Sequence, residues 1–268
     1  MHRLSKFGMF LRAVVASPVE AALFIPERIS MRHEYQPSYE PRPDWDVRLH
    51  SWLGTPWPCP ERRKLDSLWR DIAAELQAQG LRFGRHTYGQ YSDAEGSLAK
   101  AAWCTVLHQR PSVVVETGVA RGVTSRIVLE ALNRNDRGHL WSIDLPHLFE
   151  KNLHPQIGAA VPDSLKKRWS YIEGSSRRRL PSLLRSLVNV DLFIHDSLHT
   201  ARNTRFEMEQ VLSALAPGGV MIVDDISTHQ AFANFAQDFP SLETLVCPHS
   251  DRARSFFGLV HKRTNCNT

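Results

Sequence analysis

Five acidic side chains lie at the ends of short apolar runs in this 268-residue sequence. They are Glu116, Asp144, Asp196, Asp224 and Asp225. Runs rich in β-branched and aliphatic residues predict buried strands. Because parallel strands present their carboxyl ends at one edge of a sheet, these carboxylates are expected to converge there and form a binding site.

A glycine-containing turn follows the first of these runs. Val113, Val114 and Val115 predict a strand, and Gly118 and Gly122 lie in the turn that leads into a helix near residue 124. Glycine has no Cβ, so a ligand can approach the backbone closely at such a turn. Downstream, Asp144 has the position at which a Rossmann-like unit binds both hydroxyls of a ribose. These features predict a nucleoside-binding unit, with a dinucleotide site or a purely structural turn as the alternatives.

Three of the carboxylates also suit a cation. Asp196, Asp224 and Asp225 would repel one another in a shared cleft unless protons or a cation intervened. Carboxylate oxygens are the ligands that Mg²⁺ prefers, and magnesium retains open positions for a substrate hydroxyl. The alternative is structural, with Asp225 capping the next helix and Asp224 binding a backbone amide.

His199 is the candidate general base, with Asp196 as the carboxylate beside it. An aliphatic hydroxyl is barely ionised at neutral pH, so its reaction as a nucleophile needs a base, a Lewis acid or both. His199 follows the acidic strand end, where a substrate is expected. A capping or supporting role is the alternative for this histidine. His195 is a rival base, although as the last residue of its strand it could face the core.

These residues depend on alternating strands and helices for their placement. Strands are predicted over 113–116, 141–144, 168–173, 190–195, 220–223, 242–247 and 256–260, with helices between most of them. This order predicts an α/β fold, a Rossmann-like doubly wound sheet that is mainly parallel. The short polar loop before the final strand predicts a hairpin, which would make that strand antiparallel.

The first third of the chain has a different character. We predict an N-terminal helical and Pro/Trp-rich arm over residues 1–91 and the binding domain over 92–268. Residues 34–60 are proline-rich and predict an extended segment, residues 61–79 predict an amphipathic helix, and 92–95 predict a capping box. Residues 1–25 are basic and then apolar, which is consistent with a helix on the protein, on a partner subunit or on a membrane surface.

Composition excludes several classes. With 42% hydrophobic and 23% charged residues the chain has the balance of a globular protein. The net charge of +5 is dispersed, and no basic–aromatic surface is evident, so no nucleic-acid partner is expected. The four cysteines are far apart in sequence and suggest neither a zinc site nor a disulfide framework. A cytoplasmic location is the expectation, and a homo-oligomer remains open.

The motifs together resemble class I S-adenosylmethionine-dependent methyltransferases. The resemblance rests on Glu-x-Gly-x-x-x-Gly from Glu116, the acid at Asp144, the acidic fourth strand and Leu-x-Pro-Gly-Gly before the fifth. Within that class, the segment 195–200 with Asp224 and Asp225 resembles the macrocin O-methyltransferase-like group, whose members modify hydroxyls of sugars and other natural products. The resemblance covers residues 92–262.

The resemblance implies roles for individual residues. It implies that S-adenosylmethionine is bound by a set comprising Glu116, Gly118, Gly122, Asp144, Ser175, Ser176 and Asp196. Glu116 would neutralise the methionyl ammonium. Ser175 stands where relatives commonly carry an acid that reaches the adenine amino group, which is a departure from the pattern. The implied activity is magnesium-assisted O-methylation of a small-molecule hydroxyl, on a sugar or a glycosylated metabolite or lipid. A non-catalytic, cofactor-binding relative that acts through a partner is the alternative.

Overall fold

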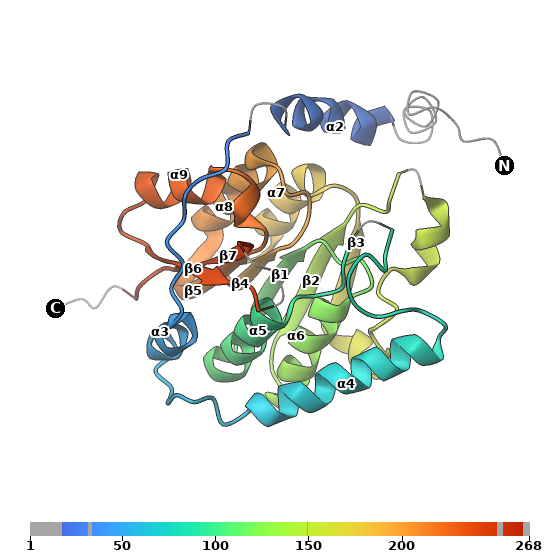
Figure 1. Cartoon of the computed structure of the whole chain (residues 1–268), viewed down its shortest axis with the longest axis horizontal. Helices are drawn as coiled ribbons and strands as arrows, with labels where there is room; N and C mark the ends of the chain where they lie inside the picture. The colour runs from blue at the N-terminus through green and yellow to red at the C-terminus, as the bar shows by residue number, and fades with distance from the viewer. Residues whose placement is uncertain (1–17, 32–33, 90, 149, 251–253, 265–268) are drawn as a thin grey trace.

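A seven-stranded sheet forms the centre of the computed structural model, which describes residues 18–31, 34–89, 91–148, 150–250 and 254–264 (Figure 1). Within these ranges the strand order is β3-β2-β1-β4-β5-β7-β6. The strands are β1 Val113–Thr117, β2 His139–Asp144, β3 Trp169–Glu173, β4 Val190–His195, β5 Leu215–Val223, β6 Glu243–Pro248 and β7 Phe256–His261.

The pairing confirms the predicted topology. Strand β1 pairs in parallel with β2 on one side and with β4 on the other, so the connection reverses direction at β1. Thr117 is in register with Ile143 of β2 and with His195 of β4, which aligns the carboxyl ends of the three strands. Strand β7 is antiparallel to both β5 and β6, as the expected hairpin requires. A ligand site is therefore expected at the β1/β4 switch point.

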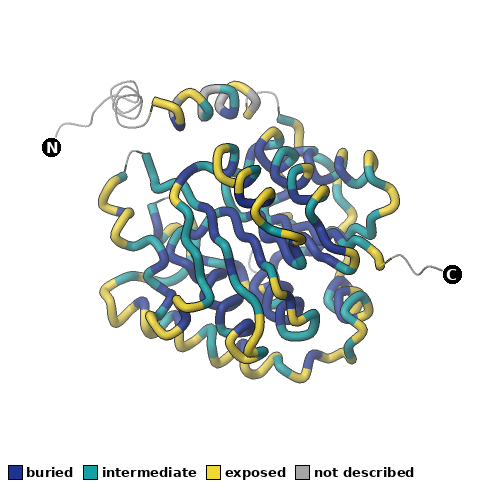
Figure 2. The backbone as a smooth tube through the Cα atoms, turned by 180° about the vertical axis from the view of Figure 1, so that it is seen from behind, coloured by how far each residue is buried: buried dark blue, intermediate teal, exposed yellow. Residues whose placement is uncertain are grey.

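Helices cover both faces of the sheet, and the buried residues lie between the layers (Figures 1 and 2). Helices α3 (Trp45–Trp52), α4 (Arg62–Ala78), α5 (Gly96–Gln109) and α6 (Val123–Arg134) contribute to one hydrophobic cluster. Helices α7 (Ser176–Ser186), α8 (Ala201–Ala214) and α9 (Ala231–Asp238) contribute to the other. Successive side chains of a strand point to opposite faces of the sheet, so each strand contributes to both clusters. Val114 belongs to the first cluster and Val115 to the second.

The arm is more helical than its proline content predicts. The helix predicted over 61–79 is confirmed as α4. The segment predicted to be extended, 34–60, contains helix α3, which occupies the proline-free stretch Trp45–Trp52. Prolines on both sides of this stretch limit the helix without preventing it.

The predicted capping box is wrong. Helix α5 begins at Gly96, and its N-cap is Glu95, whose carboxylate accepts hydrogen bonds from the backbone amides of Ser97 and Leu98 at 2.7 and 3.1 Å. Ser92 instead accepts a bond from the amide of His86. A glutamate replaces the serine as the cap because its side chain is also held by residues from the end of β6, described below.

Helix α2 (Pro18–Ser30) lies at the edge of the molecule and packs near α8. It supports the expectation of an N-terminal helix that packs on the protein, for residues 18–30 alone, since 1–17 lie outside the described residues. None of the helices in the described ranges has the length and hydrophobicity needed to cross a bilayer.

Candidate active site

A cavity of about 440 Å³ lies at the carboxyl ends of β1, β2, β4 and β5. Its walls come from the strand ends, from residues 85–88 and 91–95, and from helix α2, which contributes Glu20, Leu23 and Glu27. Cavities of this size accommodate cofactors and small substrates. The predicted site residues Gly118, Asp144, Ser175, Ser176, Asp196, His199, Asp224 and Asp225 all line it.

Asp144 is anchored at the end of β2. Its Oδ2 accepts a hydrogen bond from the backbone amide of Ala120 at 3.1 Å, which ties it to the turn after β1. Burial raises the pKa of this carboxyl, whereas hydrogen bonds from the backbone amides of Ala120 and Val119 lower it by a smaller amount. Tyr88 and Tyr91 line the same part of the cavity. The arrangement presents a carboxylate and aromatic surfaces to one pocket.

The two glycines of the turn accommodate protein backbone. Gly118 has φ +86°, and an added Cβ would collide with the carbonyl oxygen of Asp196. Gly122 has φ +78°, and its added Cβ would lie 3.0 Å from the Cα of Gly158. Both positions thus need glycine for conformation and for close packing, which is a reason that the sequence did not reveal. Gly122 is not among the described residues that line the cavity.

Glu116 is also absent from the described lining. Its side chain is fully buried, and Oε2 accepts hydrogen bonds from Ser125 Oγ at 2.6 Å and Ser142 Oγ at 2.7 Å. Burial raises its pKa to about 8, although both serines oppose the shift. Its Oε1 has no hydrogen-bond partner among the described residues. The structure therefore places Glu116 behind the cavity wall rather than on it.

Ser175 lies beside an acid that the sequence did not indicate. Its backbone amide approaches Glu20 Oε1 of helix α2 at 3.4 Å, and Arg178 donates to the same oxygen at 2.7 Å. Glu20 is 3% exposed, lines the cavity, and has a second oxygen, Oε2, without a hydrogen-bond partner in the described structure. Because 155 residues separate the two, the only available signal was an acid within an apolar N-terminal run.

The arginine run that starts α7 helps to hold α2 in place. Arg177 pairs with Glu27 at 2.7 Å, and Thr200 donates a hydrogen bond to the same carboxylate at 2.5 Å. Glu27 is 3% exposed, so these contacts are largely removed from solvent. They fix one wall of the cavity against α7 and α8.

The acidic cluster forms as predicted at the ends of β4 and β5, with a histidine inside it. His199 Nε2 lies 3.6 Å from Asp196 Oδ1 and 4.0 Å from Asp225 Oδ2. Asp225 starts a three-residue turn, Ile226–Thr228, without a side-chain cap hydrogen bond, so the alternative capping role is absent there. The helix after His199 is capped by Thr200, which accepts a bond from the amide of Asn203. His199 therefore does not cap that helix.

The charges in the cluster shift the ionisation of its members. Burial lowers the pKa of His199, but the carboxylates of Asp196, Asp225 and Asp224 outweigh it and raise that pKa to about 9. Burial and the neighbouring carboxylates raise the pKa of Asp196 to about 7, against the hydrogen bond from His199. A cation in the cavity would relieve the repulsion and lower both pKa values.

A second histidine, His249 at the end of β6, was missed by sequence reasoning. Its Nε2 lies 3.0 Å from Asp224 Oδ1, and its Nδ1 lies 2.7 Å from Glu95 Oε2. Burial lowers the pKa of His249, but the two carboxylates raise it to about 10 overall. Ser250 donates to the other Glu95 oxygen, which completes the support of the α5 cap. No motif joins residues 95, 224 and 249 in the sequence.

Comparison with known proteins agrees with this geometry. Residues 115–226 match a family model described as a methyltransferase domain. Over these residues the chain is similar to methyltransferase domains. A search of curated protein sequences finds no match to this chain.

Solved structures share the fold of this chain at low sequence identity. A structure titled a putative O-methyltransferase from Klebsiella pneumoniae has a TM-score of 0.55 and 14% identity, and covers 82% of this chain and 96% of its own. The O-methyltransferase TomG from Streptomyces achromogenes, solved with SAM, has a TM-score of 0.53 and 15% identity, with coverage of 82% and 96%. The O-methyltransferase from Bacillus cereus, solved with SAH, has a TM-score of 0.51 and 14% identity, with coverage of 81% and 95%.

His195 is not among the described residues that line the cavity. It is fully buried, with Nδ1 2.6 Å from Glu207 Oε2 and Nε2 3.0 Å from Thr204 Oγ1. Thr117 and Ser197 also donate hydrogen bonds to Glu207. His195 thus belongs to a buried polar network under the sheet edge, and His199 is the histidine of the two that faces the cavity.

The acidic cluster at the ends of β4 and β5 has the donor chemistry of a divalent-cation site. Asp196, His199 and Asp224 bring ligand atoms within 4.8 Å of one another, and so do Asp224, Asp225 and His249. The carboxylates of the three aspartates are hard donors that fit magnesium, and the imidazoles compete with a cation for them. The donor chemistry of the residues present therefore fits such an ion.

Proposed function

We propose that this chain is an S-adenosylmethionine-dependent O-methyltransferase that acts on a hydroxyl of a small molecule. One observation carries the proposal: a single cavity is lined by Asp144 beside the glycine turn and by the Asp196–His199–Asp224–Asp225 cluster. The first group suits a nucleoside, and the second suits a hydroxyl that must lose its proton. The relatives of similar fold that are titled O-methyltransferases, two of them with SAM or SAH bound, support this assignment.

The cofactor half of the site would be built from both parts of the chain. Asp144 would accept hydrogen bonds from the ribose hydroxyls, and Gly118 would present the turn backbone to the methionyl group. Ser175, Ser176 and Glu20 would surround the adenine. Glu20 supplies a buried carboxylate at Ser175, where the family pattern leads us to expect an acid. Glu116 would act on the cofactor through its charge, from behind the cavity wall. Gly122 would act through the backbone conformation of the turn.

The acceptor half of the site would ionise the hydroxyl. The acceptor oxygen attacks the methyl carbon in line with the carbon–sulfur bond, whose electrons return to sulfur as the thioether forms. The hydroxyl proton passes to His199 Nε2, and Asp196 stabilises the resulting imidazolium from 3.6 Å. Positioning of the two reactants contributes much of the rate increase in reactions of this kind.

Magnesium would be held by Asp196, Asp224 and Asp225. A bound magnesium ion would supply a Lewis acid at the acceptor end of the cavity. His249, held by Glu95, would keep Asp224 ionised and oriented toward the site. The acceptor class, a sugar or glycosylated metabolite or lipid, rests on the resemblance to the macrocin O-methyltransferase-like group.

Calorimetric titration with S-adenosylhomocysteine, with and without magnesium, tests this function. We expect binding in both conditions, because Asp144 and the metal ligands occupy different strand ends. Turnover of hydroxylated acceptors should fall in excess chelator and recover with magnesium. Full turnover in chelator would remove the metal from the mechanism. Intact cofactor binding without turnover of any sugar or glycosylated acceptor would favour the non-catalytic alternative, and absence of cofactor binding would reject both.

A further inference from the structure

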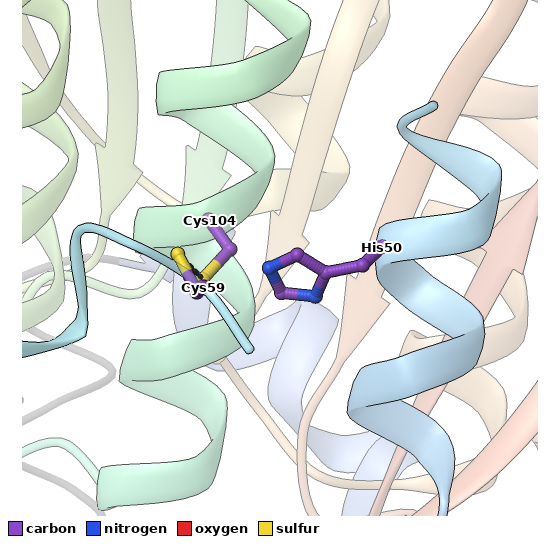
Figure 3. A group of neighbouring side chains, drawn as sticks. All are labelled: His50, Cys59 and Cys104. Carbon is purple, nitrogen blue, oxygen red and sulfur yellow. Dashed lines mark hydrogen bonds between the residues drawn. The ribbon is translucent and has the colours of Figure 1, made fainter. Parts of the chain in front are cut away.

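Two cysteines and two histidines meet far from the cavity, where the arm packs on helix α5. The sulfur atoms of Cys59 and Cys104 are 3.4 Å apart, and Cys59 Sγ is 3.4 Å from His108 Nε2. His50 points toward the two sulfurs from helix α3 (Figure 3). Ligand atoms of His50, Cys59 and Cys104 all lie within 4.8 Å of one another. The sequence suggested no such site, because 45 residues separate the two cysteines.

His50 has the arrangement of a ligand whose lone pair is directed inward. Its Nδ1 lies 2.7 Å from the carbonyl oxygen of Asp46. A carbonyl only accepts, so Nδ1 carries the proton and Nε2 has the lone pair. The residue is 1% exposed, and Nε2 has no hydrogen-bond partner among the described residues. A backbone carbonyl that fixes the tautomer in this way is characteristic of metal-binding histidines.

The chemistry and spacing of these four side chains match a zinc-type ion. Zinc prefers thiolate and imidazole ligands in a tetrahedron, and its bond lengths place neighbouring ligand atoms about 3.5–3.8 Å apart. The two observed separations of 3.4 Å need only a small adjustment.

We propose that His50, Cys59 and Cys104, completed by His108, bind one zinc-type divalent ion. Both thiols release their protons to solvent on binding, and the two thiolates neutralise the ion without any redox change. The ion links helix α3 and the segment after it to helix α5, which packs against helix α6 and strands β4 and β5. None of the four residues is among those described as lining the cavity, so the site is structural and separate from the proposed methyl transfer.

Cobalt titration of the full-length, reduced and metal-free protein tests this site. We expect one equivalent of Co²⁺ to produce a thiolate-to-cobalt charge-transfer band and the visible bands of tetrahedral cobalt, and equimolar Zn²⁺ to abolish them. Cobalt at the aspartate cluster would lack the thiolate band, so the two sites are distinguishable. Cys247→Ala, which removes a buried cysteine outside the cluster, should bind as the parent does.

Variants assign the ligands. Cys59→Ser and His50→Gln should each weaken Co²⁺ binding at least a hundredfold and shift the spectrum. Zinc should raise the melting temperature of the parent and of Cys247→Ala, but not that of the two ligand variants. Reduced parent protein that binds cobalt without the thiolate band would overturn the proposal, whether or not the variants fold. A Cys59–Cys104 disulfide, found by mass spectrometry in protein isolated with zinc present, would also overturn it.

Discussion

His249 Nε2 lies 3.0 Å from Asp224 Oδ1, although the two residues follow strands β6 and β5, which are not neighbours in the sheet. The side chain is 1% exposed and also contacts Glu95, so it bridges the helix α5 cap and the acidic cluster. Through this bridge, a residue outside the matched methyltransferase region supports one inside it. The relationship has consequences for both stability and chemistry.

Replacing His249 should destabilise the protein in a pH-dependent way. His249→Gln leaves Glu95 and Asp224 without their cation, and breaking a buried pair of this kind costs about 3–5 kcal/mol. The pKa of His249 is raised to about 10 in the folded protein, so its contribution is complete below its unfolded pKa of about 6.5 and disappears as the pH rises toward 10. Denaturant unfolding of parent and variant at pH 6 and pH 10 measures this.

The parent should lose more stability than His249→Gln over that pH interval. Asp224 affects stability at low pH instead. Its pKa is lowered to about 2, so its contribution to stability is present above about pH 4 and is lost on acidification toward pH 2. A variant whose stability difference from the parent is the same at pH 6 and pH 10 would show that His249 is not a charged partner. The matched control is His139→Gln, which replaces a histidine at the start of strand β2.

Asp144→Ala should weaken S-adenosylhomocysteine binding by roughly 10- to 150-fold, because it removes charge-assisted hydrogen bonds worth about 1.5–3 kcal/mol. Calorimetry measures the effect directly. Asp163→Ala removes an exposed acid outside the cavity and should bind as the parent does. Parental affinity in a folded Asp144→Ala protein would contradict the ribose assignment.

Glu20→Ala should remove selectivity for the adenine amino group. The parent should bind S-adenosylhomocysteine more tightly than the analogue with inosine in place of adenosine, by about tenfold for a lost hydrogen bond to a charged acceptor. In Glu20→Ala the two ligands should bind equally. Arg178→Ala, which removes the partner of Glu20 but leaves the carboxylate, should retain the preference. Equal selectivity in parent and Glu20→Ala would exclude the contact.

His199→Ala should lower kcat by about a hundredfold or more and leave cofactor affinity nearly unchanged, as expected for loss of a general base. The pKa of His199 is raised to about 9, so the imidazole is protonated at neutral pH and becomes a base as the pH rises. Because a bound cation lowers this pKa, the acidic limb of kcat/KM should lie below pH 9 in the parent with magnesium present, and it should vanish in the variant. A variant with the parental rate and pH profile would eliminate His199 as the base.

The order of strands and the acids at their ends could be predicted from the sequence, because both are local properties. Val113–Val115 is a β-branched run that needs burial, and the alternation of such runs with amphipathic helices restricts the chain to a parallel, doubly wound sheet. Once that sheet exists, Asp144, Asp196 and Asp224 must lie at its carboxyl edge. The register of β1 with β2 and β4 confirms this placement.

Tertiary structure alone decided which distant residues complete each site. Glu20 reaches Ser175 across 155 residues, His249 reaches Glu95 across 154, and Cys59 reaches Cys104 across 45. No periodicity or motif encodes such contacts, because they depend on where helix α2, the β6–β7 hairpin and the arm pack against the sheet. Glu116 shows the same limit in reverse: its position near a strand end was predictable, but the pleat turned its side chain into the interior.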